Sequence, residues 1–395
     1  MKSFVKIVNI LFSFIYRWFP VEKNTVLFLS FGGQYNDNPK YISLSLHEKH
    51  PDFIIRWVVS DKCKEIIPDY IEKVYINSRL FRKYIWTSQF LIDNHSGIRS
   101  SVYKKNLLIE NLMGHFMSSK KNNQYSISTW HGTPLKRIAM DEPNAAEVRY
   151  HINCDIMLSG SKFTTDCLKS CFKNKIKILE IGTPRNDLMF NNIIDINKLK
   201  EQLGLPLNKK IILYAPTFRN EISFSGVMQM QNFDYCKLGR TLNSKFGGSW
   251  CFVYRVHNLV LGIINDLSMK DTPELSFANG NLHDDMAEYL KCADILITDY
   301  SSCMFDYSLQ LKPCFLYTPD LENYMNKERG FYLDIAQTPF SLSLTTDELL
   351  SNIENFDGLQ YRKSVEEFNK NIGNIEDGCA SDKVVRIIEK QIKND

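Results

Sequence analysis

The chain has 395 residues, of which 44% are hydrophobic and 24% are charged. This composition excludes an intrinsically disordered protein, and the length suffices for two ordinary domains. The formal net charge of +3 is too small to indicate a protein that binds nucleic acid. None of the ten cysteines forms a CxxC pair, which argues against zinc ribbons and thioredoxin-type sites and suggests that the thiols stay reduced.

The segment 1–20 is the first expected element. Aromatic and aliphatic residues dominate it, Lys6 and Asn9 interrupt it, and Pro20 ends it. It is short for a membrane-spanning helix, and no small-residue cleavage site of a signal peptide follows. The segment therefore predicts a short amphipathic helix in a membrane interface, which would make the protein peripheral. A helix packed on the protein's own body is the alternative.

Strands alternating with helices are expected after Pro20. Apolar runs with polar ends recur at βαβ spacing, which is typical of parallel sheets covered on both faces. The first five runs are Thr25–Gly33, Phe53–Ser60, Lys73–Asn77, Phe90–Asn94 and Gln124–Trp130. A second series comprises Ile156–Gly160, Ile176–Gly182, Lys210–Thr217, Cys251–His257, Ile295–Ser302 and Cys314–Pro319.

The polar segment Asn191–Asn208 is the expected hinge between two domains, with a helix at Ile196–Leu203. The sequence thus predicts an α/β protein with two doubly wound, Rossmann-like domains, at residues 21–190 and 191–375, and a C-terminal helix at 376–395. Such domains face a cleft, and their ligands bind beyond the carboxyl ends of the strands.

His131 is the first candidate catalytic residue, in the stretch STWHGTPLKRIAMD. It directly follows an expected strand, Gly132 allows close backbone approach, and Thr133 could cap a helix that begins at Pro134. An imidazole with a pKa near 6.5 can take up a proton at neutral pH. The alternative is a histidine that merely donates to a backbone carbonyl.

Other polar residues also follow expected strands. Arg255 and His257 share one strand face and form a candidate phosphate clamp; an Arg–carboxylate bridge beside a bystander histidine is the alternative. Ser301 and Ser302 would open a helix and supply hydroxyls and free N–H groups to an anion, unless they only cap it. Further candidates at strand ends are Thr217, Arg219, Thr298, Asp299 and Arg185.

No metal site is expected. The chain has no Walker loop and no GxGxxG motif, and His283-Asp284-Asp285 is better interpreted as a helix start than as a metal cluster.

Together these motifs resemble the CDP-glycerol:poly(glycerophosphate) glycerophosphotransferases of teichoic-acid and capsule synthesis. The resemblance covers roughly residues 124–385, and the pair of WHGTPLK and ITDYSS motifs is highly specific to this family. The matching pieces are Thr129–Arg137, Gly182–Asp187, Leu213–Arg219, Arg255–His257, Ala293–Tyr307, Lys312–Tyr324, Arg329–Asp334 and Asp377–Ser381.

The resemblance implies a GT-B-like fold, with an acceptor-side first domain and a second domain that binds a CDP-polyol. It assigns His131 as the base, His257 to the phosphates of the donor, and Ser301 and Ser302 to the diphosphate. The chain departs from the family at Asn258, where proline is usual, and at Thr183, where tyrosine is usual. Both changes bear on which CDP-polyol is accepted.

The expected function is transfer of a polyol phosphate from CDP-glycerol, or alternatively CDP-ribitol, to a lipid-linked or oligosaccharide acceptor, with release of CMP. No cofactor is expected, and the enzyme would work at the cytoplasmic face of a bacterial cell membrane. A GT-B glycosyltransferase that uses a nucleotide sugar, or a non-catalytic partner that binds lipid-linked saccharide, are the alternatives. The oligomeric state stays open.

Overall fold

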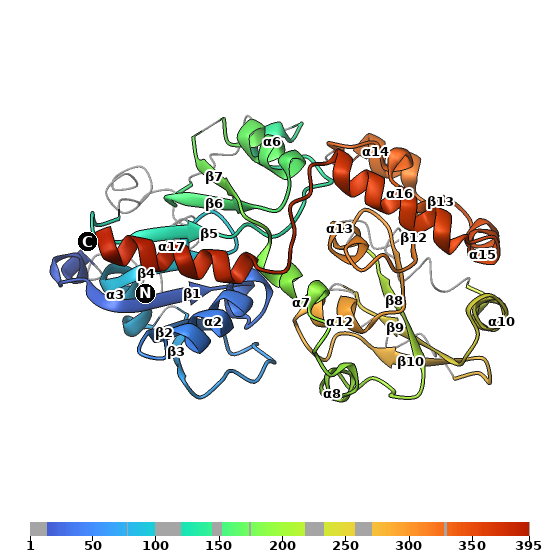
Figure 1. The fold of residues 1–395 in the computed structure, drawn as a ribbon, viewed down its shortest axis with the longest axis horizontal. Coiled ribbons are helices and arrows are strands. Elements are labelled where there is room, and N and C mark those ends of the chain that lie inside the picture. Colours follow the sequence, from blue (N-terminus) through green and yellow to red (C-terminus); the bar gives the residue numbers. More distant parts are fainter. Residues whose placement is uncertain are drawn as a thin grey trace, which may run out of the picture.

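A computed structural model describes residues 14–76, 78–98, 120–143, 152–173, 175–217, 233–256, 271–327 and 330–394. The chain forms two parallel β-sheets that lie side by side and carry helices (Figure 1). The first sheet consists of β1 Glu22–Leu29, β2 Ile54–Val59, β3 Ile71–Tyr75, β4 Ser88–Asp93, β5 Tyr125–Ser128, β6 Ile156–Ser159 and β7 Lys177–Glu180. The second consists of β8 Lys210–Ala215, β9 Trp250–Tyr254, β10 Leu275–Asn279, β11 Ile295–Thr298, β12 Cys314–Tyr317 and β13 Ser341–Ser343.

Both sheets have the doubly wound strand order. The first runs β3-β2-β1-β4-β5-β6-β7 and the second β10-β9-β8-β11-β12-β13. The order reverses between β1 and β4 in one sheet and between β8 and β11 in the other, and ligands bind at such switch points. The expected pair of Rossmann-like domains is therefore confirmed. Two edge strands of the second sheet, β10 and β13, were not among the expected runs.

Most of the helices that the structure describes connect these strands, η1 precedes the first strand, and α15 to α17 follow the last. The α-helices are α2 Asp37–Lys49, α3 Arg79–Thr87, α6 Lys162–Cys171, α7 Asp187–Phe190, α8 Ile196–Gln202, α10 Tyr235–Phe246, α12 Met286–Cys292, α13 Cys303–Ser308, α14 Leu321–Lys327, α15 Thr346–Glu354, α16 Gly358–Asn371 and α17 Ala380–Asn394. Short 3-10 helices are η1 Phe14–Trp18, η2 Phe31–Gly33, η3 Ala139–Asp141, η5 Pro184–Asn186 and η8 Ile335–Gln337.

Strand β1 shows why the apolar runs form buried strands. Val26 and Phe28 pack into a core with α2 and α17, whereas Leu27 and Leu29 pack into a core with α3 on the opposite face. Successive side chains of a strand point to opposite faces, so a strand covered on both sides must be apolar at every position.

The last helix returns to the first domain. Figure 1 shows α16 on the second domain and α17 along the first, joined by a segment that crosses between them. Val384, Val385 and Ile388 of α17 have no exposed surface and complete the core of the first sheet. The crossing segment pairs with the first domain, since the N–H of Ile375 donates to the Gly160 carbonyl at 3.0 Å.

The helix expected to begin at Thr133 and Pro134 is wrong. Residues 133–138 instead run to the second domain, where the N–H of Arg137 donates to Gly330 O and the carbonyl of Leu135 accepts from the N–H of Tyr332. These partners replace the bonds of a helix, and the Leu135 side chain is buried in the core of the second domain. The segment with the candidate base thereby ties the two domains together.

The expected membrane-interface helix falls largely outside the described residues. Its described end, η1, packs on α3, and the Trp18 side chain is 86% exposed. Within the described parts of the chain, no helix has the length and apolar character needed to cross a bilayer.

Candidate active site

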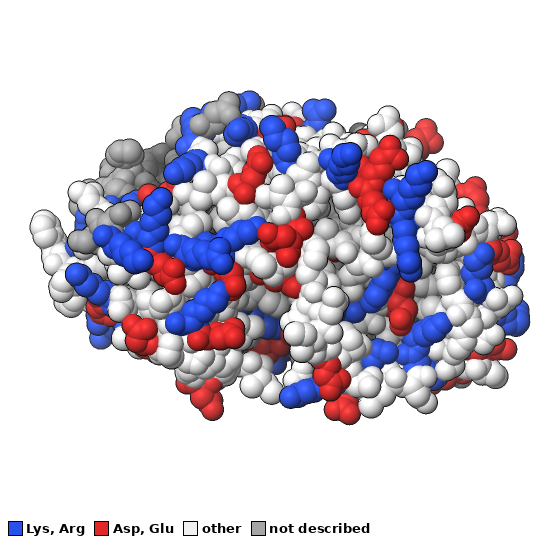
Figure 2. All heavy atoms as spheres, in the orientation of Figure 1, with Lys and Arg blue, Asp and Glu red and all other residues white. Residues whose placement is uncertain are grey.

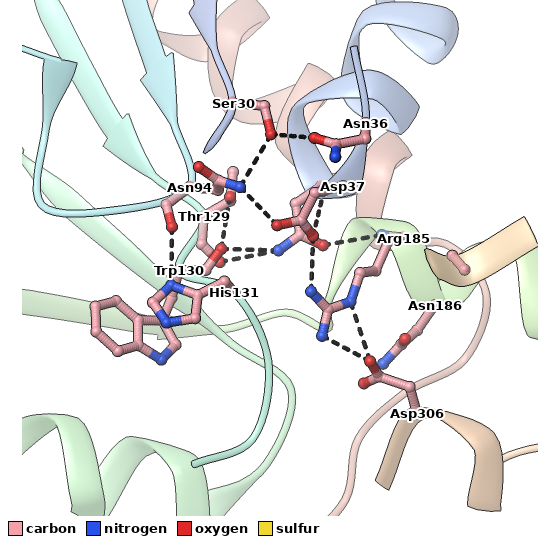
Figure 3. Close-up of polar contacts among 12 residues, drawn as sticks. Ser30, Asn36, Asp37, Asn94, Thr129, Trp130, His131, Arg185, Asn186 and Asp306 are labelled. Carbon is pink, nitrogen blue, oxygen red and sulfur yellow. Dashed lines mark hydrogen bonds and ion pairs between the residues drawn. The ribbon is translucent and has the colours of Figure 1, made fainter. Parts of the chain in front are cut away.

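His131 lies at the carboxyl end of β5 with one ring nitrogen held and the other open. Its Nδ1 lies 3.0 Å from the carbonyl oxygen of Asn94, the residue after β4 (Figure 3). A carbonyl can only accept, so Nδ1 carries the proton and Nε2 has the lone pair. Among the described residues, no protein group hydrogen-bonds Nε2. The carbonyl contact that was the alternative to catalysis thus selects the tautomer that a base needs.

Strained backbone presents this imidazole. Trp130, directly before it, has a φ of 53°, in the left-handed region that large side chains avoid. The Trp130 carbonyl is held in return, accepting from Nδ2 of Asn38 at 2.9 Å. Gly132 has a φ of 110°, and a Cβ there would clash with the Arg185 guanidinium. Gly132 is therefore required both for its conformation and for close packing.

A cavity of about 250 Å³ joins the two domains at His131. Its walls carry groups from the carboxyl ends of β5, β8 and β11, as expected for paired switch points. The lining residues are Trp130, His131, Gly132, Thr133, Pro134, Leu135, Lys136, Ile138, Thr217, Tyr300, Ser301 and Ser302. The structure thus brings the candidate base and the hydroxyl-rich turn before α13 to a single cavity.

The hydroxyls of Ser301 and Ser302 do not serve mainly as N-caps of α13. Ser302 precedes α13 but makes no side-chain capping hydrogen bond, and Ser301 Oγ accepts from the Cys303 N–H at a long 3.4 Å. Their hydroxyls can therefore bind a ligand in the cavity.

Thr298 and Asp299 support this wall from behind. Asp299 accepts from both the N–H and the hydroxyl of Thr217, at 2.8 and 2.6 Å, which joins the ends of β8 and β11. The Thr298 hydroxyl donates to the Ala215 carbonyl at 2.6 Å. Thr298 and Asp299 thus shape the site through Thr217 and the backbone.

The structure gives Arg255 backbone partners, and its contact with a phosphate stays a prediction. Its guanidinium donates to the carbonyl oxygens of Gly280, His283 and Asp284, at 2.5 to 2.8 Å, and lies over the Tyr289 ring. Arg255 therefore holds the loop before α12. His257 and Arg219, the other expected cations, lie outside the described residues.

Arg185 also has partners other than the expected phosphates. Its guanidinium contacts Asp37 of α2 at 2.7 Å and Asp306 of α13 at 2.6 Å (Figure 3). These two carboxylates accept three of its five N–H donors, and Arg185 does not line the cavity, so its direct contact with phosphate stays a prediction.

The sequence profile of the CDP-glycerol:poly(glycerophosphate) glycerophosphotransferase family matches residues 10–390. The chain belongs to this family. The teichoic acid poly(glycerol phosphate) polymerase of Staphylococcus epidermidis is 31% identical over 94% of this chain and 51% of that protein. The chain spans about half the length of the first curated relatives it matches. The teichoic acid poly(ribitol-phosphate) polymerase of Bacillus spizizenii is 30% identical, over 53% of this chain and 33% of that protein.

Among solved structures, that of the wall teichoic acid polymerase TagF matches with a TM-score of 0.79 and 27% identity. The match covers 100% of this chain and 97% of that chain. It confirms the expected GT-B-like arrangement of two domains.

Several residues of this glycerophosphotransferase-family site were missed by the sequence analysis. Lys136 lines the cavity and carries the only permanent charge among the described lining residues. Asn94 contacts the candidate base His131, and Asp37 and Asp306 contact Arg185. Asn94 ended an expected strand, which was a usable signal. The pairing of Asp37 and Asp306 with Arg185 is long-range and gave no local signal.

No metal centre emerges in the ranges that the structure describes. There, no three His, Cys, Asp or Glu residues lie close enough to hold an ion. Asp285 caps α12 by accepting from the Ala287 N–H at 3.1 Å, which confirms that His283-Asp284-Asp285 is a helix start.

The pH dependence of activity should report the environment of His131. Burial lowers the pKa of His131 to about 4, although the Asn94 carbonyl and Asp37 act in the opposite direction. The ring is then neutral at neutral pH, and kcat/KM should fall only as the pH drops well below 6.5. The stability contributed by this group is present above the unfolded pKa of about 6.5 and is lost toward the folded value. A kcat/KM profile from pH 4 to 8 measures this; an acid limb at the ordinary histidine pKa would contradict it.

Proposed function

We propose that this chain transfers glycerol phosphate from CDP-glycerol to a hydroxyl group of a lipid-linked saccharide or polyol-phosphate acceptor, with release of CMP. The observation that carries the proposal is the single cavity lined by the His131 imidazole on one side and by Ser301 and Ser302 on the other. A base and an anion-binding wall in one cavity are what transfer from a diphosphate to a hydroxyl requires.

In the proposed reaction the acceptor oxygen attacks the phosphorus that bears glycerol. The bond from this phosphorus to the bridging oxygen breaks, and CMP leaves with the electron pair. Nε2 of His131 takes the acceptor's proton, a step typically worth about 10²–10⁴-fold. Ser301 and Ser302 can donate to the diphosphate oxygens, and Lys136 can balance the charge that develops on CMP. The approaching diphosphate also raises the proton affinity of His131.

We choose glycerol over ribitol as the transferred polyol because the relatives named for glycerol phosphate align with more of the chain. The relative named for glycerol phosphate aligns with 94% of the chain, and the relative named for ribitol phosphate with 53%. Incubation with CDP-glycerol and CDP-ribitol in turn, with lipid-linked and oligosaccharide acceptors, tests the choice by mass spectrometry. CMP and a product heavier by one glycerol phosphate are expected. Release of a nucleoside diphosphate from a UDP- or GDP-sugar would instead indicate a glycosyltransferase. If no nucleotide is released from any donor, the chain would be a non-catalytic binding partner.

We also propose that the chain works at the cytoplasmic face of the cell membrane, bound peripherally through the segment 1–20. Support comes from η1 at the end of this segment, where Ile15, Trp18 and Phe19 are 51, 86 and 42% exposed. Such side chains beside a cation, here Arg17, are typical of interfacial segments.

Deletion of residues 1–20 is expected to weaken binding to anionic liposomes, measured by flotation. The circular dichroism spectrum of the deletion variant controls for folding. Unchanged flotation of a folded deletion variant would show that membrane binding does not depend on this segment.

A further inference from the structure

Arg185 does not line the cavity, but it packs against the lining residue Gly132 and contacts both domains. It lies in η5, and its side chain is 13% exposed. The side chains of its partners, Asp37 of the first domain and Asp306 of the second, are 7 and 5% exposed. A buried ion pair of this kind contributes little net stability, but its loss leaves an unpaired charge that displaces its surroundings. The role of the Arg185 ion pairs is therefore geometric, because they fix the relative positions of the groups that they join.

On the first-domain side, three contacts lead from Arg185 to the segment that carries His131. The Gly132 backbone packs directly against the guanidinium. The backbone N–H of Arg185 donates to Oδ1 of Asn38 at 3.0 Å, and Nδ2 of Asn38 donates to the Trp130 carbonyl at 2.9 Å. Trp130 and Gly132, on either side of the histidine, are thus fixed relative to Arg185.

The third contact leads from Arg185 through Asp37 and Asn94 to the ring of His131. Asp37 accepts from Nη1 of Arg185 at 2.7 Å and from Nδ2 of Asn94 at 2.6 Å. The carbonyl of Asn94 is the group that holds Nδ1 of His131. Asp37 adopts a φ of 59°, so this carboxylate is held in an uncommon backbone conformation.

On the second-domain side, Arg185 reaches the helix that follows the serines. Nε and Nη2 of Arg185 both donate to Oδ2 of Asp306, at 3.1 and 2.6 Å. Asp306 lies in α13, one turn after Ser302. A shift of Asp306 therefore moves the turn with Ser301 and Ser302 relative to the base.

We propose that Arg185 is a positioning residue that sets the distance between the base and the diphosphate-binding turn, by clamping Asp37 of the first domain to Asp306 of the second. This inference rests on the proposed function, because it assigns a purpose to the spacing of His131 and Ser301–Ser302. Phosphoryl transfer depends chiefly on positioning, and a misplacement of about 1 Å can cost about 10²-fold in rate. Loss of the clamp should therefore lower kcat more than it weakens donor binding.

The chain offers a matched control at the same domain interface. Lys40 of α2 pairs with Asp285 at 2.9 Å, and the Asp285 side chain is 1% exposed. This pair also joins the two domains through a buried carboxylate, but it runs from α2 to the cap of α12 and not to the His131 segment. Asp306→Asn and Asp285→Asn remove the same charge with the same change of shape.

The test compares wild type, Asp306→Asn, Arg185→Lys and Asp285→Asn in thermal midpoint, kcat and KM for CDP-glycerol. Asp306→Asn and Arg185→Lys are expected to lower kcat at least about tenfold, with a donor KM within about threefold. Asp285→Asn should keep kcat within about threefold at a similar loss of thermal midpoint. If Asp306→Asn does not fold, the kcat of Arg185→Lys tests the clamp, because lysine keeps the charge but lacks the planar guanidinium that reaches two carboxylates.

A second readout does not need activity. The NMR signal of the His131 ring, assigned by its absence in His131→Ala, should shift in Asp306→Asn and stay in place in Asp285→Asn. Equal kcat losses in both variants, or an unmoved ring signal in Asp306→Asn, would overturn the inference. A wild type that is inactive on every CDP-polyol, combined with a shifted ring signal, would refute the proposed function and leave the clamp supported.

Discussion

Replacement of His131 by alanine should lower kcat for transfer by about 10²–10⁴-fold while the chain stays folded. The variant loses the Nε2 lone pair that faces the cavity, whereas the cavity and the serines remain. The Trp130 and Gly132 backbone is held by other contacts, from Asn38 and Arg185, so the loop should keep its course. CMP release from CDP-glycerol at saturating acceptor measures the effect.

His95→Ala is the control for this variant. The His95 ring lies 6.0 Å from the His131 ring but does not line the cavity. Its removal perturbs the same neighbourhood without removing the base and should cost far less. Near-normal turnover of a folded His131→Ala variant would rule out the assignment of His131 as the base.

Leu135→Ala should lower the free energy of unfolding by about 2–5 kcal/mol, the usual loss for a buried leucine. Leu135 is 1% exposed and belongs to the core of the second domain, although the strand before it, β5, belongs to the first. The cavity left behind would also loosen the segment that carries His131, so kcat should fall as well.

Urea denaturation measures this loss, with Leu359→Ala as control. Leu359 is 82% exposed, so its truncation should change the midpoint little. Equal midpoints for the two variants would show that the His131 segment is not anchored in the second domain.

Local sequence patterns predicted most of the two sheets. Runs such as Phe90–Asn94 and Ile295–Ser302 each begin with three consecutive apolar residues, because their strands are buried on both faces. The two strands that were not predicted, β10 and β13, form the edges of the second sheet. Strand β13 has only three residues. Short edge strands carry too few apolar positions for a periodic signal.

The candidate site was predictable where a strand end alone fixes a side chain. His131, Thr217, Ser301 and Ser302 all line one cavity for this reason. The prediction was wrong where tertiary partners decide. Thr133-Pro134 has the composition of a helix start, but contacts to Gly330 and Tyr332 outweigh that local preference.

The partners of Arg185 were not predicted, for a related reason. A strand-end arginine predicts an anion ligand, and nothing local showed that the anions are Asp37 and Asp306, which lie 148 and 121 residues away in the chain.

A crystal structure of His131→Ala with CDP-glycerol bound tests the proposed site most directly. The diphosphate oxygens are expected within hydrogen-bond distance of Ser301 or Ser302, with the glycerol-bearing phosphorus facing the space vacated by the imidazole. A nucleotide whose diphosphate lies away from both serines, or whose glycerol phosphate points away from residue 131, would contradict the proposed site.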